Sequence, residues 1–248
     1  MLLAAVWRPG TGEQRWSVGS PDSFKSDDTF AFKHALRISS ITANGDQLGG
    51  VWRPGTGEQR WESGMSANDF KAADAQWFAK GLRITAVSGG LTAVWRPGTG
   101  EQRWETGMSH SDFKTEDAKW FDHGLRIAAL TVNGGNFTAV WRPGTGEQRW
   151  SSGMSVGEFK AQDANWFNHG LRIASLSVDS GSFNAVNHRR HFGALGATAS
   201  GIKVSSGGRE LLSGIDSGTT LSLGGLAFLE QKTLQKLKPS PQTHRSAI

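Results

Sequence analysis

Apolar side chains recur at helical spacing in four segments of the chain. In the second segment, Phe70, Ala73, Trp77 and Phe78 fall at positions i, i+3, i+7 and i+8, which form one face of a helix. The third and fourth segments repeat this stripe, whereas the first has Phe30-Ala31-Phe32 in place of the Trp-Phe pair. The pattern predicts helices over residues 21–34, 67–80, 110–123 and 156–169.

Capping residues support the ends of these helices. Ser66 is a good N-cap, and Asp69 follows three residues later as an acidic capping partner. The same spacing recurs in the later segments, and the first segment has Ser20-Pro21, with proline at the first helical position. Gly81 supplies a left-handed stop at the end of the second helix.

A pair of strands follows each helix. Residues 82–87 read as a strand that is apolar on both faces, as in a strand covered by helices. Asn133-Gly134-Gly135 is a strong hairpin signal, and residues 137–141 form the returning strand. We therefore predict an α+β fold of four tandem hairpin-plus-helix repeats that form a curved or closed array.

One sequence of ten residues, Trp-Arg-Pro-Gly-Thr-Gly-Glu-Gln-Arg-Trp, occurs four times without change. We call it the decapeptide; its copies are Trp7–Trp16, Trp52–Trp61, Trp95–Trp104 and Trp141–Trp150. Their spacing of about 45 residues is typical of tandem structural repeats. Because the Pro-Gly pair favours a tight turn, each copy is predicted to form a loop between two aromatic rings.

The array stops near residue 187, where a fifth copy begins and is abandoned. Residues 199–208 and 216–225 then match each other as Ser-Gly-Gly segments and resemble the repeats of autotransporter adhesins. We predict three regions: a tryptophan-rich α/β domain over residues 1–192, a β-rich solenoid-like segment over 193–235, and a flexible basic tail over 236–248. His188 and His191 lack further ligands spaced for a metal.

Composition narrows the classes of function. The absence of cysteine excludes disulfides and thiolate metal sites. The net charge of +5 favours acidic partners only mildly. No apolar run is long enough for a membrane-spanning helix, and no signal peptide is recognisable at the start of the sequence. We predict no cofactor and no metal site.

Each repeat also carries one aspartate on the apolar side of its helix and one arginine in its first strand. The aspartates are Asp28, Asp74, Asp117 and Asp163, and the arginines are Arg37, Arg83, Arg126 and Arg172. Because a buried carboxylate requires a partner, we predict that Asp74 contacts an arginine or backbone N–H groups. A catalytic role is the alternative, but catalytic groups are built once per fold, so four identical pairs favour a scaffold.

The tryptophans of the decapeptide admit three interpretations. They can be core, a platform for a sugar face, or a stacking surface for nucleic-acid bases. We predict that at least one tryptophan of each pair is core. The segment between the two tryptophans should be exposed, because its glycines, proline and charged residues do not suit a core.

The longer pattern points to a family. The segments Ala-Val-Trp-Arg-Pro-Gly-Thr-Gly, Gln-Arg-Trp, Ser-Gly-Met-Ser, Trp-Phe and Gly-Leu-Arg-Ile resemble the bacterial tandem repeat that also occurs in polyglycine hydrolases, over about residues 1–187. The resemblance implies an accessory α/β region beside a β-lactamase-like serine hydrolase domain. No segment after residue 187 matches that domain, and Ser111-Asp112-Phe113-Lys114 matches its Ser-x-x-Lys motif in a single copy, by chance.

These observations predict a non-enzymatic, multivalent binding protein, extracellular or at the cell surface, which recognises a glycan or another cell-surface polymer. The alternatives are an accessory module of a secreted hydrolase and a structural or adhesive surface protein. Nucleic acid ranks last as a partner, and self-association stays open. The predicted ligand-binding residues are those of the four decapeptides: Trp7, Arg8, Glu13, Gln14, Trp16, Trp52, Arg53, Glu58, Gln59, Trp61, Trp95, Arg96, Glu101, Gln102, Trp104, Trp141, Arg142, Glu147, Gln148 and Trp150.

Overall fold

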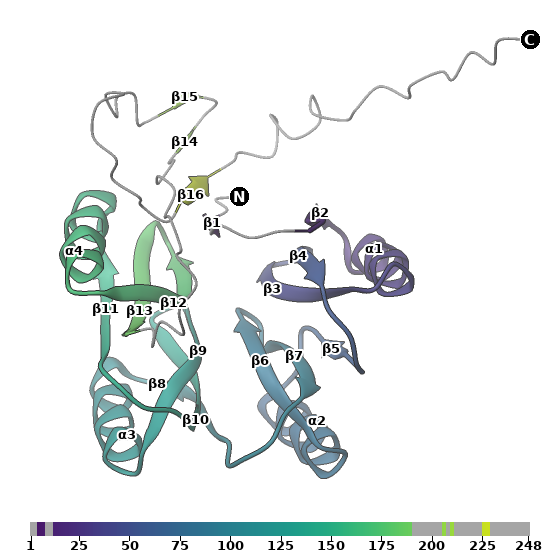
Figure 1. Ribbon diagram of the computed structural model, residues 1–248, viewed down its shortest axis with the longest axis horizontal. Helices are drawn as coiled ribbons and strands as arrows, with labels where there is room; N and C mark the ends of the chain where they lie inside the picture. The colour runs from purple at the N-terminus through teal and green to yellow at the C-terminus, as the bar shows by residue number, and fades with distance from the viewer. Residues whose placement is uncertain (1–3, 8–11, 190–204, 207–208, 211–224, 229–248) are drawn as a thin grey trace, which may run out of the picture. The chain divides into compact units, whose positions relative to one another are not determined.

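The computed structural model describes residues 4–7, 12–189, 205–206, 209–210 and 225–228 (Figure 1). The chain divides into two compact units, Gly10–Gly196 and a second made of Met1–Pro9 with Ala197–Ile248. In the second unit, β1 (Ala4–Trp7) pairs with β16 (Gly225–Phe228), and β14 (Ser205–Ser206) pairs with β15 (Arg209–Glu210). Apart from these strands, the predicted solenoid-like segment and basic tail lie outside the described residues.

The first unit consists of four helices and four small antiparallel sheets in tandem. The helices are α1 (Pro21–Lys33), α2 (Ala67–Ala79), α3 (His110–Asp122) and α4 (Val156–Asn168), which confirms the predicted ranges. The sheets have the strand orders β2-β4-β3, β5-β7-β6, β8-β10-β9 and β11-β13-β12. The described strands form separate sheets and no closed barrel, so the closed alternative is not realised there.

The strands of the sheets have the following bounds. The central strands are β4 (Gln47–Pro54), β7 (Thr92–Pro97), β10 (Asn136–Pro143) and β13 (Ser182–Arg189). Each pairs in a hairpin with the strand before it: β3 (Leu36–Asn44), β6 (Leu82–Ser88), β9 (Leu125–Asn133) and β12 (Leu171–Asp179). On its other side it pairs with an edge strand: β2 (Arg15–Gly19), β5 (Arg60–Glu62), β8 (Arg103–Met108) and β11 (Gln148–Met154).

The edge strands are the main departure from the predicted unit, which contained only a hairpin and a helix. β5 is three residues long, and its partner strand lies more than thirty residues later, where Trp61 pairs with Val94. A strand so short has no periodicity of its own, so only the distant pairing reveals it. Each decapeptide after the first therefore begins in the central strand of one sheet and ends in the edge strand of the next.

The capping predictions are confirmed. The side chains of Ser66 and Asp69 form a reciprocal capping box, as do the corresponding pairs at α3 and α4. Ser20 caps α1, with Pro21 at the first helical position. Gly81 follows α2 with a φ of 79°, the left-handed conformation that glycine tolerates best. Local signals thus place the helices without help from the tertiary structure.

The core of each of the first three repeats is completed by the repeat that follows it. Phe24 and Trp52 of the first repeat cluster with Val94 of the second. Trp95 clusters with Val140 of the third repeat, and Trp141 with Val186 of the fourth. Hydrogen bonds also cross between hairpins, as from the Leu130 N–H to Ser175 Oγ. A single repeat therefore does not bury its apolar face alone, and stacking supplies the rest.

One part of the predicted helical stripe is not core. Phe78 and its equivalent Phe121 are exposed, and each ring stacks on an arginine guanidinium, Arg83 and Arg126 respectively. The ring at i+8 therefore lies at the surface, where the cation–π contact with an arginine of the following strand holds it. Among the described helices, none combines the length and apolar character of a membrane span.

Candidate functional site

The two tryptophans of a decapeptide reach the same helix from two sheets. The first tryptophan ends a central strand and is fully buried at Trp52, Trp95 and Trp141. The second lies on the next edge strand and packs edge-on against the helix phenylalanine of the preceding repeat, as Trp104 does on Phe70. We call the contact between a helix and the decapeptide that follows it a junction. The prediction that at least one tryptophan of each pair is core is confirmed for the last three decapeptides; the Trp7 side chain of the first lies outside the described part.

A buried aspartate lies at the centre of each junction. The Asp74 carboxylate of α2 accepts hydrogen bonds from Trp95 Nε1 at 3.0 Å, Gln102 Nε2 at 2.8 Å and Trp104 Nε1 at 2.7 Å. The same three donors surround the aspartates of the other two junctions. These sets are Asp28 with Trp52, Gln59 and Trp61, and Asp117 with Trp141, Gln148 and Trp150.

The glutamine joins the helix to the sheet. While its Nε2 donates to the aspartate, its Oε1 accepts from a backbone N–H, that of Ile84 for Gln102 at 2.7 Å. A bulge between Ile84 and Ala86 interrupts the strand pairing at this point. Ile38 and Ile127 make the same contact with Gln59 and Gln148. Because every member is hydrogen-bonded, the network fixes the position of one repeat on the next.

The predicted contact of the aspartate with an arginine or with backbone N–H groups is wrong in the first three repeats, because the donors are side-chain N–H groups. Arg83 donates instead to the carbonyl oxygens of Gly100, Phe78 and Leu82, and the other two arginines do the same at their own positions. The two charged groups are satisfied separately: indole and amide N–H groups donate to the carboxylate, and carbonyl oxygens accept from the guanidinium, which is itself buried at Arg37 and Arg83. The arginine instead ties the helix end to the decapeptide loop.

The exposure predicted for the whole loop holds only in part. Gln59 is 7% exposed and Gln102 and Gln148 are half-buried, because the glutamine points to the aspartate. The glutamate and second arginine face solvent and pair with each other: Glu58 with Arg60, Glu101 with Arg103, and Glu147 with Arg149. Hydrogen bonds from Arg189 and Arg149 lower the pKa of Glu147. The residues of the decapeptide thus divide into those that point into the junction and those that face solvent.

In the later decapeptides, the first arginine reaches back to the preceding loop, as Arg142 Nη2 does to the Thr99 carbonyl oxygen. Arg53 Nη2 donates to Gln14 Oε1 at 2.8 Å. Burial, followed by the charge of Arg37, lowers the pKa of Arg96; burial, followed by the charge of Arg83, lowers the pKa of Arg142. Neighbouring loops therefore bring guanidinium groups of successive repeats close together.

The first and last copies of the pattern have no complete junction among the described residues. In the first decapeptide, the side chains of Trp7 and Arg8 lie outside the described part, while Glu13 and Gln14 are exposed and Trp16 is 42% exposed. In the fourth repeat, Asn187 stands where a tryptophan stands in the others. Asp163 is 5% exposed, and burial raises its pKa to about 6 against the opposing charge of Arg172.

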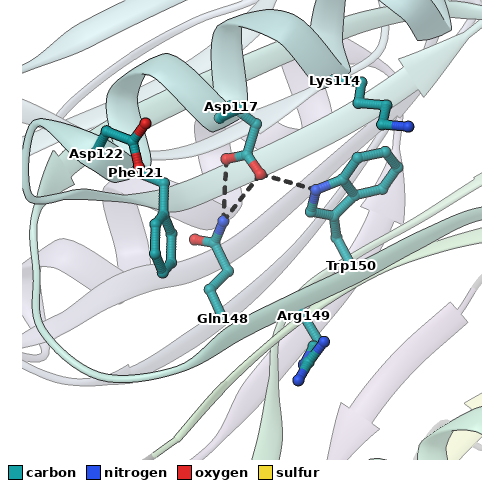
Figure 2. Close-up of a pocket in the computed structure, with 8 residues that line it drawn as sticks. Lys114, Asp117, Phe121, Asp122, Gln148, Arg149 and Trp150 are labelled. Atoms are coloured by element: carbon teal, nitrogen blue, oxygen red, sulfur yellow. Dashed lines mark hydrogen bonds between the residues drawn. The ribbon is translucent and has the colours of Figure 1, made fainter.

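A pocket opens beside the third junction (Figure 2). It is lined by Lys114, Asp117, Ala118, Phe121 and Asp122 of α3, and by Gln148, Arg149 and Trp150 of β11. Figure 2 shows Asp117 directed at Gln148 and Trp150, so the hydrogen-bonded network forms one wall. Lys114, Phe121 and Asp122 were not among the predicted site residues. Their only signal was the recurrence of a lysine and a phenylalanine at the same helix positions in other repeats.

Comparison with known families identifies the repeat. The family model described as polyglycine hydrolase-like, structural repeat matches residues 61–95 and 104–143. The matched segments begin in β5 and β8 and end in β7 and β10, so each contains an edge strand, a helix and a hairpin. No curated protein matches the chain. Two adjacent repeats of this chain thus match the polyglycine hydrolase-like structural repeat, and the first and fourth repeats share their helix and three-stranded sheet.

Proposed function

We propose that this chain is a non-enzymatic, multivalent binding module that recognises a glycan or a similar polymer at the junctions between its repeats. The observation that carries the proposal is the pocket at the third junction, where aromatic and charged side chains lie around a rigid hydrogen-bonded wall. A concave site with aromatic surface and a few fixed polar groups suits a ligand rich in hydroxyl groups.

The structure narrows the residues that can meet such a ligand. The first tryptophan and the glutamine of each decapeptide face inward, so they act by holding the wall of the pocket in place. The residues available for contact at the third junction are Lys114, Phe121, Asp122 and Arg149, of which Phe121 is 37% exposed. We therefore propose that these pocket-lining residues, rather than the buried tryptophans, contact the ligand.

Repetition supports the multivalent part of the proposal. The second junction has Lys71, Phe78 and Arg103 at the positions of Lys114, Phe121 and Arg149. Weak equal sites on one chain gain strength through effective concentration when the ligand is itself a repeating polymer. An extracellular or cell-surface location follows from a ligand of this kind and belongs to the same proposal.

A second candidate is a non-catalytic accessory module of a secreted hydrolase, which the description of the repeat family favours. The two candidates are compatible, because an accessory region can position an enzyme on a polymer. They differ in one measurement: the first requires that the repeats bind a polymer on their own.

The test is binding of the whole chain to an array of neutral and acidic glycans, followed by titration of any hit. Lys114→Ala should weaken the binding, because Lys114 lines the pocket. Lys119→Ala is the matched control, since it removes the same charge from the same helix at an exposed position where it pairs with Glu116. A chain that binds no polymer, or that responds equally to the two variants, would contradict the proposal.

A further inference from the structure

The three filled junctions define what the aspartate of a repeat requires. Each receives three N–H donors from the decapeptide that follows, at distances from 2.7 to 3.0 Å for Asp74. Two of these donors, the glutamine and the second tryptophan, are two residues apart on the way into an edge strand. Side chains at this spacing point to the same face of a strand and so reach the carboxylate together.

The fourth repeat presents the same aspartate without these donors. Among the described residues, no group donates a hydrogen bond to the Asp163 carboxylate, although it is almost fully buried on α4. Asn187, at the position of the first tryptophan, is 0% exposed, and neither its Nδ2 nor its Oδ1 has a hydrogen-bond partner. Buried polar groups are rarely left in this state, because each costs about 1–3 kcal/mol without a partner.

The hairpin of the fourth repeat is also less covered than its counterparts. Leu130 and Val132 of β9 are buried in the core cluster to which the next hairpin contributes Val186, whereas the equivalent Leu176 and Val178 of β12 are only half-buried. In the filled arrangement these side chains lie at the contact between successive sheets, where β9 packs on β12. The described part of the fourth repeat therefore has both an unfilled polar site and an unfilled apolar face.

The first repeat carries the corresponding glutamine and tryptophan, and neither donates to an aspartate among the described residues. Trp16 is 42% exposed, whereas the equivalent Trp61, Trp104 and Trp150 are half-buried and donate to an aspartate. Gln14 is exposed and contacts Arg53 through its Oε1, which leaves its Nε2 without a partner among the described residues. Neither side chain engages Asp163 of its own chain.

We propose that Gln14 and Trp16 of one copy of this chain donate to Asp163 of a second copy, so that the protein associates head to tail through a fourth junction. A second copy is the occupant because the donor set, its spacing and the apolar contact all match those of the internal junctions. Such a contact joins two different surfaces, so it generates a ring or an open filament rather than a two-fold dimer. The proposal does not depend on the binding of any glycan.

The experiment is analytical ultracentrifugation of the whole chain over a range of concentrations. The wild-type chain should associate as its concentration rises. Trp16→Ala should raise the dissociation constant by about 30-fold or more, as expected for a tryptophan at the centre of an interface. Trp16→Phe keeps the ring and loses the N–H donor, so its association should be weakened less. Circular dichroism should show that these variants stay folded, because the changed side chain is exposed.

A mixing experiment tests the direction of the contact. Trp16→Ala retains the Asp163 site, and Asp163→Ala retains the donors of β2. At a concentration where the wild type associates, each variant alone should stay monomeric, and an equal mixture should form a one-to-one pair and no larger species. A wild-type chain that is monomeric at every concentration would overturn the proposal. The same holds if Gln14 and Trp16 reach Asp163 of their own chain. Association that survives in both variants would overturn it as well.

Discussion

The third and fourth repeats share a fold but differ at one buried carboxylate. In the third, Asp117 is held by two indoles and an amide from the decapeptide that follows. In the fourth, Asp163 occupies the same helix position, and burial raises its pKa to about 6 because donors of that kind are missing among the described residues. The comparison shows that the decapeptide serves the repeat before it as much as the repeat it begins.

The difference also separates two roles that the sequence pattern combines. Where the decapeptide is present, its inward residues position one repeat on the next and its outward residues form a polar edge. Where it is replaced, the helix, the hairpin and the capping box all persist, since α4 and its box are formed as in the other repeats. The helix and hairpin of a repeat therefore form from local sequence signals, and the decapeptide determines how one repeat packs on the next.

The largest expected effect on stability comes from removing an aspartate that accepts hydrogen bonds from all three donors of a junction. Asp74→Ala should destabilise the protein by about 3–5 kcal/mol, because it leaves two indole N–H groups and an amide buried without their acceptor. Asp163→Ala, the matched change in the fourth repeat, should cost far less, because no described donor loses its partner. Urea denaturation of the two variants beside the wild type gives the comparison. Equal losses of stability would show that the two sites are equivalent after all.

The second expected effect is a pH dependence specific to the fourth repeat. The pKa of Asp163 is about 6 in the folded chain and near 3.8 as an ordinary aspartate, so the folded state binds more protons between these values. Stability should therefore fall as the pH rises from about 3.8 to 6 and stay level above. Asp163→Asn should remove this slope and stabilise the protein at pH 7 by up to about 3 kcal/mol.

The measurement is urea denaturation at several pH values between 4 and 7, in a chain that also carries Trp16→Ala so that association does not contribute. A slope that persists in Asp163→Asn would assign the effect to other groups. A slope of the opposite sign would mean that the carboxylate is stabilised as the anion, which contradicts an unfilled site.

The smallest expected effect distinguishes inward from outward residues of one decapeptide. Gln102→Ala should cost about 1–3 kcal/mol, because Asp74 loses a donor and the Ile84 N–H loses its acceptor. The adjacent Arg103→Ala removes only a solvent-exposed pair with Glu101 and should cost less than about 1 kcal/mol. Thermal denaturation of both variants is sufficient. If Arg103→Ala proves the more damaging, the division of the decapeptide into two sets is wrong.

The elements of each repeat could be read from the sequence because their signals are local. A stripe of apolar residues at helical spacing, a capping serine and a glycine stop all lie within about fifteen residues of each other, and the four helices follow from them. The glycine hairpin of β9 and β10 is local in the same way. The burial of Trp52, Trp95 and Trp141 followed from their place near the end of an apolar strand.

The partners of those elements were decided only by the tertiary structure. Asp74 was expected to contact an arginine or backbone N–H groups, but its donors are side chains that lie 21 to 30 residues later in the chain. The edge strands depend in the same way on pairing with residues more than thirty positions away. The sequence also shows that Asn187 replaces a tryptophan. What that replacement removes becomes visible only in the fold, because the fold brings that tryptophan to an aspartate on a different element.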